Sequence, residues 1–144
     1  MSRHSLVIGE RNLGNIAFTA HVLRDRVIEK PNETIRFDEI ALNNGLGYDF
    51  KTGVFTCPLS GEYFFAVSIN TDKMRQIVTE LVVNDHVMMR VHPASRRLKS
   101  NQCSPGIITN LQIGEQVFVR TPIDQSDVKL YGTRKSTFMG FRIK

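Results

Sequence analysis

Histidines and carboxylates are the residue types from which a catalytic or metal site in this chain would be built. There are four histidines, His4, His21, His86 and His92. They show no metal-ligand spacing, and His86 and His92 stand six residues apart on a strand-like segment, so both are expected on its solvent face. The carboxylates are dispersed, and the chain has no Gly-x-Ser-x-Gly elbow, phosphate-binding loop or His-Glu-x-x-His motif. The sequence therefore predicts no catalytic residues and a protein that is not an enzyme.

The two cysteines, Cys57 and Cys103, leave two alternatives open. One closes a predicted strand and the other precedes a strand, so a sandwich could bring them together as a disulfide. Equally, they could be two separate thiols, one of them buried. Their spacing offers no paired-ligand zinc motif.

One sequon for N-glycosylation begins at Asn32, directly after Pro31. A proline at this point predicts a loop, where an asparagine could accept a glycan in a secreted protein. A three-residue sequon also arises by chance, so it does not establish secretion by itself.

Alternation of apolar and polar residues dominates the chain, and helical periodicity is almost absent. One face of the segment 62–69 carries Tyr63, Phe65, Val67 and Ile69. In the segment 86–92, Val87, Met89 and Val91 are expected to point inward. Strands are predicted at 16–22, 34–42, 54–57, 62–69, 79–83, 86–92, 107–113, 116–121 and around 139–143.

Tight turns separate these segments. Asn84-Asp85 and Gly114-Glu115 each join two predicted strands, and Asn, Asp and Gly tolerate the positive φ that hairpin turns require. About ten short strands in one domain indicate an all-β sandwich or barrel.

Composition is typical of one soluble globular domain. Hydrophobic residues make up 41% and charged residues 23% of 144 residues, and no apolar run approaches the roughly 20 residues that span a bilayer. Residues 1–14 are expected to form a flexible N-terminal arm, and residues 15–144 the globular domain. The first 14 residues lack the apolar core of a signal peptide, so a secretion signal would have been removed, would lie in a longer precursor or would be missing from this sequence.

A motif between residues 37 and 65 resembles the signature of the globular domain of complement component 1q. The matching residues are Phe37, Asn43, Tyr48, Phe55, Gly61, Tyr63 and Phe65. Val67 replaces the last aromatic residue of the signature. Further matches occur in order along the chain, at residues 17–20, at 113–119 and at 136–141, the last with Phe138 and Gly140. These residues, together with Gly53 in a turn, are interpreted as defining the fold by packing rather than as a binding site.

This resemblance implies a ten-stranded antiparallel jelly roll, shared with the tumour necrosis factor ligands, that is extracellular and forms a homotrimer. Members of the family act as pattern-recognition heads, hormone-like ligands or organisers of synapses and matrix. No cofactor is expected to be required. Some members bind calcium, but no calcium ligand set maps onto this chain, so calcium is expected to be optional.

Basic residues gather in three predicted loops. Successive strands of an antiparallel sandwich alternate in direction, so the loops 71–76, 93–105 and 124–136 are expected at one end, away from the termini. Together these loops account for the whole net charge of +5. The candidate ligand-binding residues are Lys73, Arg75, Arg96, Arg97, Lys99, Lys129, Arg134 and Lys135.

A positive loop end is suited to acidic ligands. We therefore expect a secreted pattern-recognition or lectin-like protein of innate immunity that binds anionic glycans, lipopolysaccharide or acidic protein surfaces as a trimer. The charge is too small to indicate nucleic-acid binding. The alternative is a ligand that engages a receptor or matrix protein, as other members of the family do.

Overall fold

The computed structural model describes residues 13–71, 78–91, 106–124 and 127–144, and this part of the chain contains twelve β-strands and no helix. The strands are β1 (Ala17–His21), β2 (Arg26–Ile28), β3 (Glu39–Asn44), β4 (Tyr48–Asp49), β5 (Val54–Thr56), β6 (Gly61–Ser68), β7 (Thr79–Val83), β8 (His86–Val91), β9 (Gly106–Leu111), β10 (Gln116–Arg120), β11 (Val128–Leu130) and β12 (Thr137–Arg142). The described residues therefore contain no helix that could cross a membrane.

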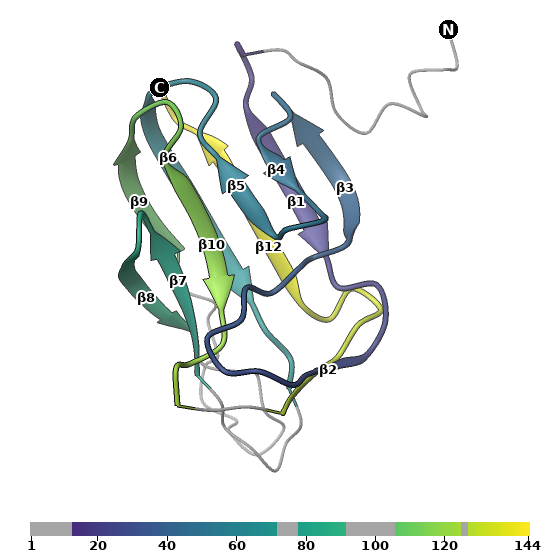
Figure 1. Ribbon diagram of the computed structural model, residues 1–144. Coiled ribbons are helices and arrows are strands. Elements are labelled where there is room, and N and C mark those ends of the chain that lie inside the picture. The colour runs from purple at the N-terminus through teal and green to yellow at the C-terminus, as the bar shows by residue number, and fades with distance from the viewer. Residues whose placement is uncertain (1–12, 72–77, 92–105, 125–126) are drawn as a thin grey trace, which may run out of the picture.

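Ten of the strands form two five-stranded antiparallel sheets that pack face to face (Figure 1). One sheet has the order β3-β1-β12-β6-β9 and the other the order β4-β5-β10-β7-β8. The predicted ten-stranded jelly roll is therefore confirmed. A separate two-stranded ribbon, β11-β2, lies at one end of the sandwich and was not predicted.

Most predicted strands agree with the structure to within two residues at each end. The segment 34–42 is the exception, because the regular strand runs from Glu39 to Asn44. Thr34 makes only an isolated bridge with Arg120, and the Ile35 amide donates to the Val119 carbonyl. The residues before β3 are thus held by single contacts with the opposite sheet instead of by a continuous ladder.

The core between the sheets is built from the inward positions of the alternating strands. In β6 and the residue after it, Tyr63, Phe65, Val67 and Ile69 are each at most 1% exposed, as their shared face predicts. Phe138 of β12 lies 4.9 Å from Phe18, centroid to centroid, with the rings nearly perpendicular. Edge-to-face contacts of this kind stabilise an aromatic cluster beyond the area that it buries.

The β7–β8 hairpin corrects one sequence prediction. Asn84 and Asp85 both have positive φ, 48° and 65°, as their turn requires. A bulge between Leu81 and Val82 then reverses the face of the first residues of β8. Val87, expected to point inward, is 37% exposed, whereas Val91 is buried.

A buried polar contact fastens the start of β4 to the strand before it. The Asn43 side chain donates to the Tyr48 carbonyl and accepts from the Tyr48 amide. The Tyr48 hydroxyl donates to the Phe37 carbonyl and accepts from the Phe37 amide. These signature residues therefore satisfy one another's buried polar groups, which a sandwich core requires.

Burial of two tyrosines gives a prediction for alkaline pH. Tyr48 and Tyr63 are 3% and 0% exposed, and burial raises the pKa of both hydroxyls above the usual value of about 10. The folded state therefore binds these two protons more tightly than the unfolded state. The stability linked to them is complete below about pH 10 and is lost as the pH rises above that value.

We accordingly expect the chain, which has three tyrosines, to show at most one tyrosinate while it remains folded. The other two should ionise together with unfolding. Ultraviolet absorbance and circular dichroism recorded along one alkaline titration test this. Two or more tyrosinates in a protein with native circular dichroism would contradict it.

Candidate functional site

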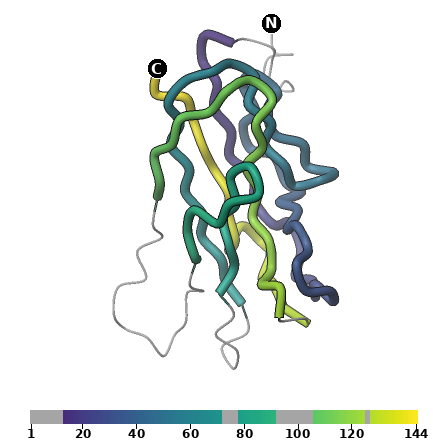
Figure 2. The backbone as a smooth tube through the Cα atoms, turned by 60° about the vertical axis from the view of Figure 1, so that its left-hand side comes forward, coloured from purple at the N-terminus to yellow at the C-terminus, as the bar shows by residue number. Residues whose placement is uncertain are grey.

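The strands run lengthwise between two ends of the sandwich (Figure 2). At one end, the Arg142 amide donates to the Ile16 carbonyl and the Glu62 amide to the Lys144 carbonyl. The opposite end, which we call the loop end, holds the paired strand termini His21, Thr137 and Ser68 of one sheet and Thr79 and Val91 of the other. The residues that flank the three basic segments are therefore gathered at the loop end, as the strand count predicts.

The structure describes three of the eight candidate ligand-binding residues. Lys129 lies in β11, and Arg134 and Lys135 lie in the connection between β11 and β12; all three are exposed. The other five, Lys73, Arg75, Arg96, Arg97 and Lys99, lie outside the described residues. Their role as ligand contacts therefore stays a prediction.

The connection from β1 to β3, residues 22–38, also lies at the loop end, and the sequence analysis did not include it. Its strand β2 pairs with β11, with Val27 opposite Lys129. This connection carries four basic and four acidic residues, so it adds no net charge. Within this connection, the Asp38 carboxylate forms an ion pair with Arg26.

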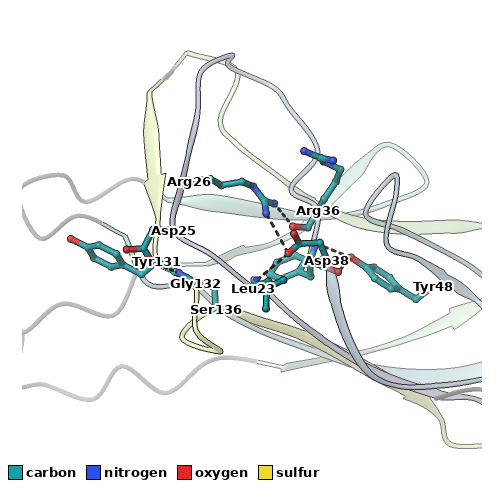
Figure 3. A network of polar contacts seen from close by, with 10 residues as sticks. Leu23, Asp25, Arg26, Arg36, Asp38, Tyr48, Tyr131, Gly132 and Ser136 are labelled. Atoms are coloured by element: carbon teal, nitrogen blue, oxygen red, sulfur yellow. Dashed lines mark hydrogen bonds and ion pairs between the residues drawn. The ribbon is translucent and has the colours of Figure 1, made fainter. Parts of the chain in front are cut away.

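A polar network joins the β2 ribbon to the sandwich (Figure 3). Asp38 accepts a hydrogen bond from the Leu23 amide at 3.0 Å and lies 3.5 Å from the Arg26 guanidinium. Arg26 also donates to the Arg36 carbonyl. Burial lowers the pKa of Arg26, and the neighbouring carboxylate of Asp38 opposes that effect. The Arg26 side chain therefore holds this connection in place and is not counted among the candidate ligand-binding residues.

The connection between β11 and β12 is fixed by hydrogen bonds along its backbone. The Tyr131 amide donates to the Asn70 carbonyl at 2.9 Å, and the Gly132 amide donates to the Asp25 carboxylate at 2.7 Å. Ser136 is buried, and its hydroxyl donates to the Tyr131 carbonyl at 3.1 Å. A Cβ atom on Gly132 would lie 2.4 to 2.6 Å from the backbone of Arg24, so only glycine fits there.

Residues 132–135 form a tight turn of unusual composition. The Lys135 amide donates to the Gly132 carbonyl at 3.1 Å, and both central residues, Thr133 and Arg134, have positive φ, 56° and 64°. Such turns ordinarily use Asn, Asp or Gly. A β-branched threonine there is a marked outlier, which indicates that the surrounding contacts impose this geometry.

Two lysines, one in β11 and one in this turn, approach the same aromatic ring. The Lys129 ammonium lies 5.6 Å and the Lys135 ammonium 5.7 Å from the centroid of the Tyr131 ring. Arg134, in contrast, pairs with Glu39 at 3.2 Å. Sequence reasoning identified the lysines but missed the tyrosine between them. We call Lys129, Tyr131 and Lys135 the lysine–tyrosine cluster.

The outer face of the β3-β1-β12-β6-β9 sheet exposes an apolar row. Phe141 of β12 pairs with Phe64 of β6, and Phe64 pairs with Ile108 of β9. Ile108 is 66% exposed and Phe141 42% exposed, and the rings of Phe64 and Phe141 are 5.5 Å apart. On the outer face of the other sheet, Glu80 forms ion pairs with both Arg90 and Arg120. Only the first of these two rows has the apolar character of a protein interface.

Two further sequence predictions fall on this structure. Cys57 is buried, with its sulfur 3.2 Å from the Leu59 carbonyl oxygen, and Cys103 lies outside the described residues, so the choice between a disulfide and two thiols stays a prediction. Asn32 is exposed in a turn, as a glycan acceptor must be. Among the residues that the structure describes, no three His, Cys, Asp or Glu side chains come together as a metal site.

Comparison with known proteins gives consistent matches along the chain. The C1q domain family matches residues 17–143. Heavy metal-binding protein HIP of Mytilus edulis is 30% identical over 129 residues, covering 90% of this chain and 61% of that protein. Complement C1q and tumor necrosis factor-related protein 9 of Mus musculus is 29% identical over 127 residues, covering 87% of this chain and 38% of that protein. The chain thus spans less than two thirds of the length of either relative.

Solved structures share the fold at lower identity. The globular domain of zebrafish complement 1qA superposes with a TM-score of 0.67 at 20% identity, covering 90% of this chain and 98% of that one. Eiger, a tumour necrosis factor of S. frugiperda, superposes with a TM-score of 0.62 at 14% identity, covering 89% and 91%. With the family match over residues 17–143, the signature residues in the core and the two five-stranded sheets, this chain belongs to the C1q domain family.

Proposed function

We propose that this protein is an extracellular, non-enzymatic binding protein that acts as a homotrimer and recognises anionic glycans through its loop end. The observation that carries the proposal is the position of the strand ends. All three basic segments attach at the loop end, opposite the end where Ile16 and Lys144 meet Arg142 and Glu62.

The apolar row supports the trimeric part of the proposal. C1q-like and tumour necrosis factor-like homologues form trimers. An exposed row of Phe141, Phe64 and Ile108 is costly on an isolated surface and favourable in an interface. A trimer would present three loop ends, and avidity for a repeating ligand would then exceed single-site affinity by roughly a hundredfold.

Excess positive charge supports the anionic part of the proposal. The charges of the three basic segments sum to +5, which is the net charge of the whole chain, and the charges of the connection 22–38 sum to zero. Glycans of microbial or host surfaces that carry sulfate, phosphate or carboxylate groups repeat these charges along a chain, so they match a multivalent receptor. Such binding weakens with salt because exposed charges are screened over about 8 Å at physiological ionic strength.

A glycan array tests this function. We expect the protein to bind sulfated, phosphorylated or uronate-bearing glycans and lipopolysaccharide in preference to neutral ones, and to lose this binding as salt is raised. The variant Arg96→Gln/Arg97→Gln should bind about tenfold more weakly, since each exposed charge contributes up to about 1 kcal/mol.

The matched control is Lys51→Gln/Lys144→Gln, which removes the same charge at two exposed positions elsewhere. It should bind as the unaltered protein does. Equal weakening in both variants would show that only net charge matters. Absence of binding to every glycan would overturn the proposal and favour a receptor or matrix ligand instead.

A further inference from the structure

Two ammonium groups at the loop end share one aromatic ring. Lys129 and Lys135 approach the same Tyr131 ring, and neither forms an ion pair with a carboxylate of the described residues. Two like charges at the same ring repel each other, and an exposed cation–π contact contributes only about 0.5 to 1 kcal/mol. An anion placed between them would relieve the repulsion.

The backbone that carries these side chains is already fixed by contacts within the protein. Tyr131 is anchored to Asn70 and Ser136, and Lys135 is returned toward Tyr131 by the turn with two positive-φ residues. Lys129 lies two residues before Tyr131, so an extended backbone directs both side chains to one face. A preformed arrangement avoids much of the ordering cost of binding.

We infer that the lysine–tyrosine cluster is a subsite for one acidic sugar unit of a polysaccharide. The two ammonium groups would bind its sulfate or carboxylate by charge-assisted hydrogen bonds, and the Tyr131 ring would hold both ammonium groups in place for that contact. This inference rests on the proposed function and assigns part of it to described residues.

The chemistry around the cluster favours a polysaccharide over an anionic membrane. Polybasic membrane sites use about four to eight basic residues, whereas this cluster has two. The Asp25 carboxylate accepts from the Gly132 amide beside the cluster, and Asp127 lies two residues before Lys129; a continuous negative surface would repel both carboxylates. A polysaccharide spaces its charges with neutral rings, and half-exposed Val27, opposite Lys129, offers such a ring an apolar contact.

Binding to immobilised dextran sulfate and polygalacturonate, with neutral dextran as reference, tests the subsite. We expect Lys129→Gln/Lys135→Gln to weaken binding about tenfold and to reduce its dependence on salt. Tyr131→Leu should weaken binding several-fold with unchanged salt dependence, and Tyr131→Phe, which keeps the ring, should lose much less binding than Tyr131→Leu. Lys51→Gln/Lys144→Gln is again the control of equal charge, and thermal unfolding confirms that each variant is folded.

Three results would overturn the subsite in distinguishable ways. Normal binding of dextran sulfate by all Lys129, Lys135 and Tyr131 variants would disprove the subsite and leave the proposed function standing. Loss of binding only to phosphatidylserine vesicles or to polyglutamate would assign the cluster to another class of partner. Failure of the unaltered protein to bind either polysaccharide or any acidic glycan would remove the proposed function as well.

Discussion

Replacing Ile108 by Glu should convert the proposed homotrimer into folded monomers. Ile108 is 66% exposed in one chain, and it continues the apolar row of Phe64 and Phe141. If that row is buried between copies, Ile108→Glu places an unpaired carboxylate in the interface, which costs several kcal/mol. Light scattering should then report a mass near 16.4 kDa per particle, instead of three times that value.

Ile123→Glu serves as the control for this experiment. Ile123 is 76% exposed and lies after β10 at the loop end, outside the apolar row, so its replacement should leave the trimer intact. If the Ile108→Glu variant still formed a trimer that dissociated at the same concentration as the unaltered protein, this face would not be the interface. The monomer should also bind dextran sulfate about a hundredfold more weakly, because avidity is lost.

Replacing Phe138 by Ala should be the most destabilising single change in the core. Phe138 is fully buried and its ring lies within 4.9 to 6.2 Å of the rings of Phe18, Phe37, Tyr48 and Phe65. Truncation removes these contacts and leaves a cavity that the close-packed sheets cannot fill. The free energy of unfolding should fall by about 3 to 5 kcal/mol.

Denaturant unfolding measures this loss, and the Ile108→Glu monomer is the suitable background because trimer assembly would otherwise enter the measured stability. Phe50→Ala is the matched control. Phe50 is 43% exposed after β4, so its removal should cost less than about 1 kcal/mol. Equal losses in the two variants would contradict the assignment of the core.

The long strands could be predicted because their own residues carry the information. In β6, every second side chain is apolar and buried, and the Asn84-Asp85 turn adopts the positive φ that its residue types permit. The ribbon strands β2 and β11 have three residues each, too few to show alternation. Their pairing depends on contacts between segments about a hundred residues apart, which no local pattern reports.

A bulge and a turn account for two further differences between the structure and the sequence-based predictions. One additional residue in β8 moves Val87 from the core side to the surface, and a sequence of alternating residues does not reveal it. Thr133 and Arg134 likewise give no turn signal, since neither residue type favours positive φ.

The candidate site was therefore predictable in part. Strand alternation placed the basic loops at one end, and the two-residue spacing of Lys129 and Tyr131 was a usable sign of a shared face. The approach of Lys135 to the same ring was not predictable, because it depends on the strained turn. The pairing of Glu39 with Arg134 joins distant segments, so charge counting alone could not show which cations are neutralised.

Hydrogen–deuterium exchange of the unaltered protein, with and without dextran sulfate, tests the central claim most directly. We expect the ligand to slow exchange in the connection 131–136 and in the other segments of the loop end. Exchange in the turns at the opposite end, such as Gln112–Glu115, should not change. Protection at that opposite end, with none in 131–136, would contradict recognition of anionic glycans by the loop end.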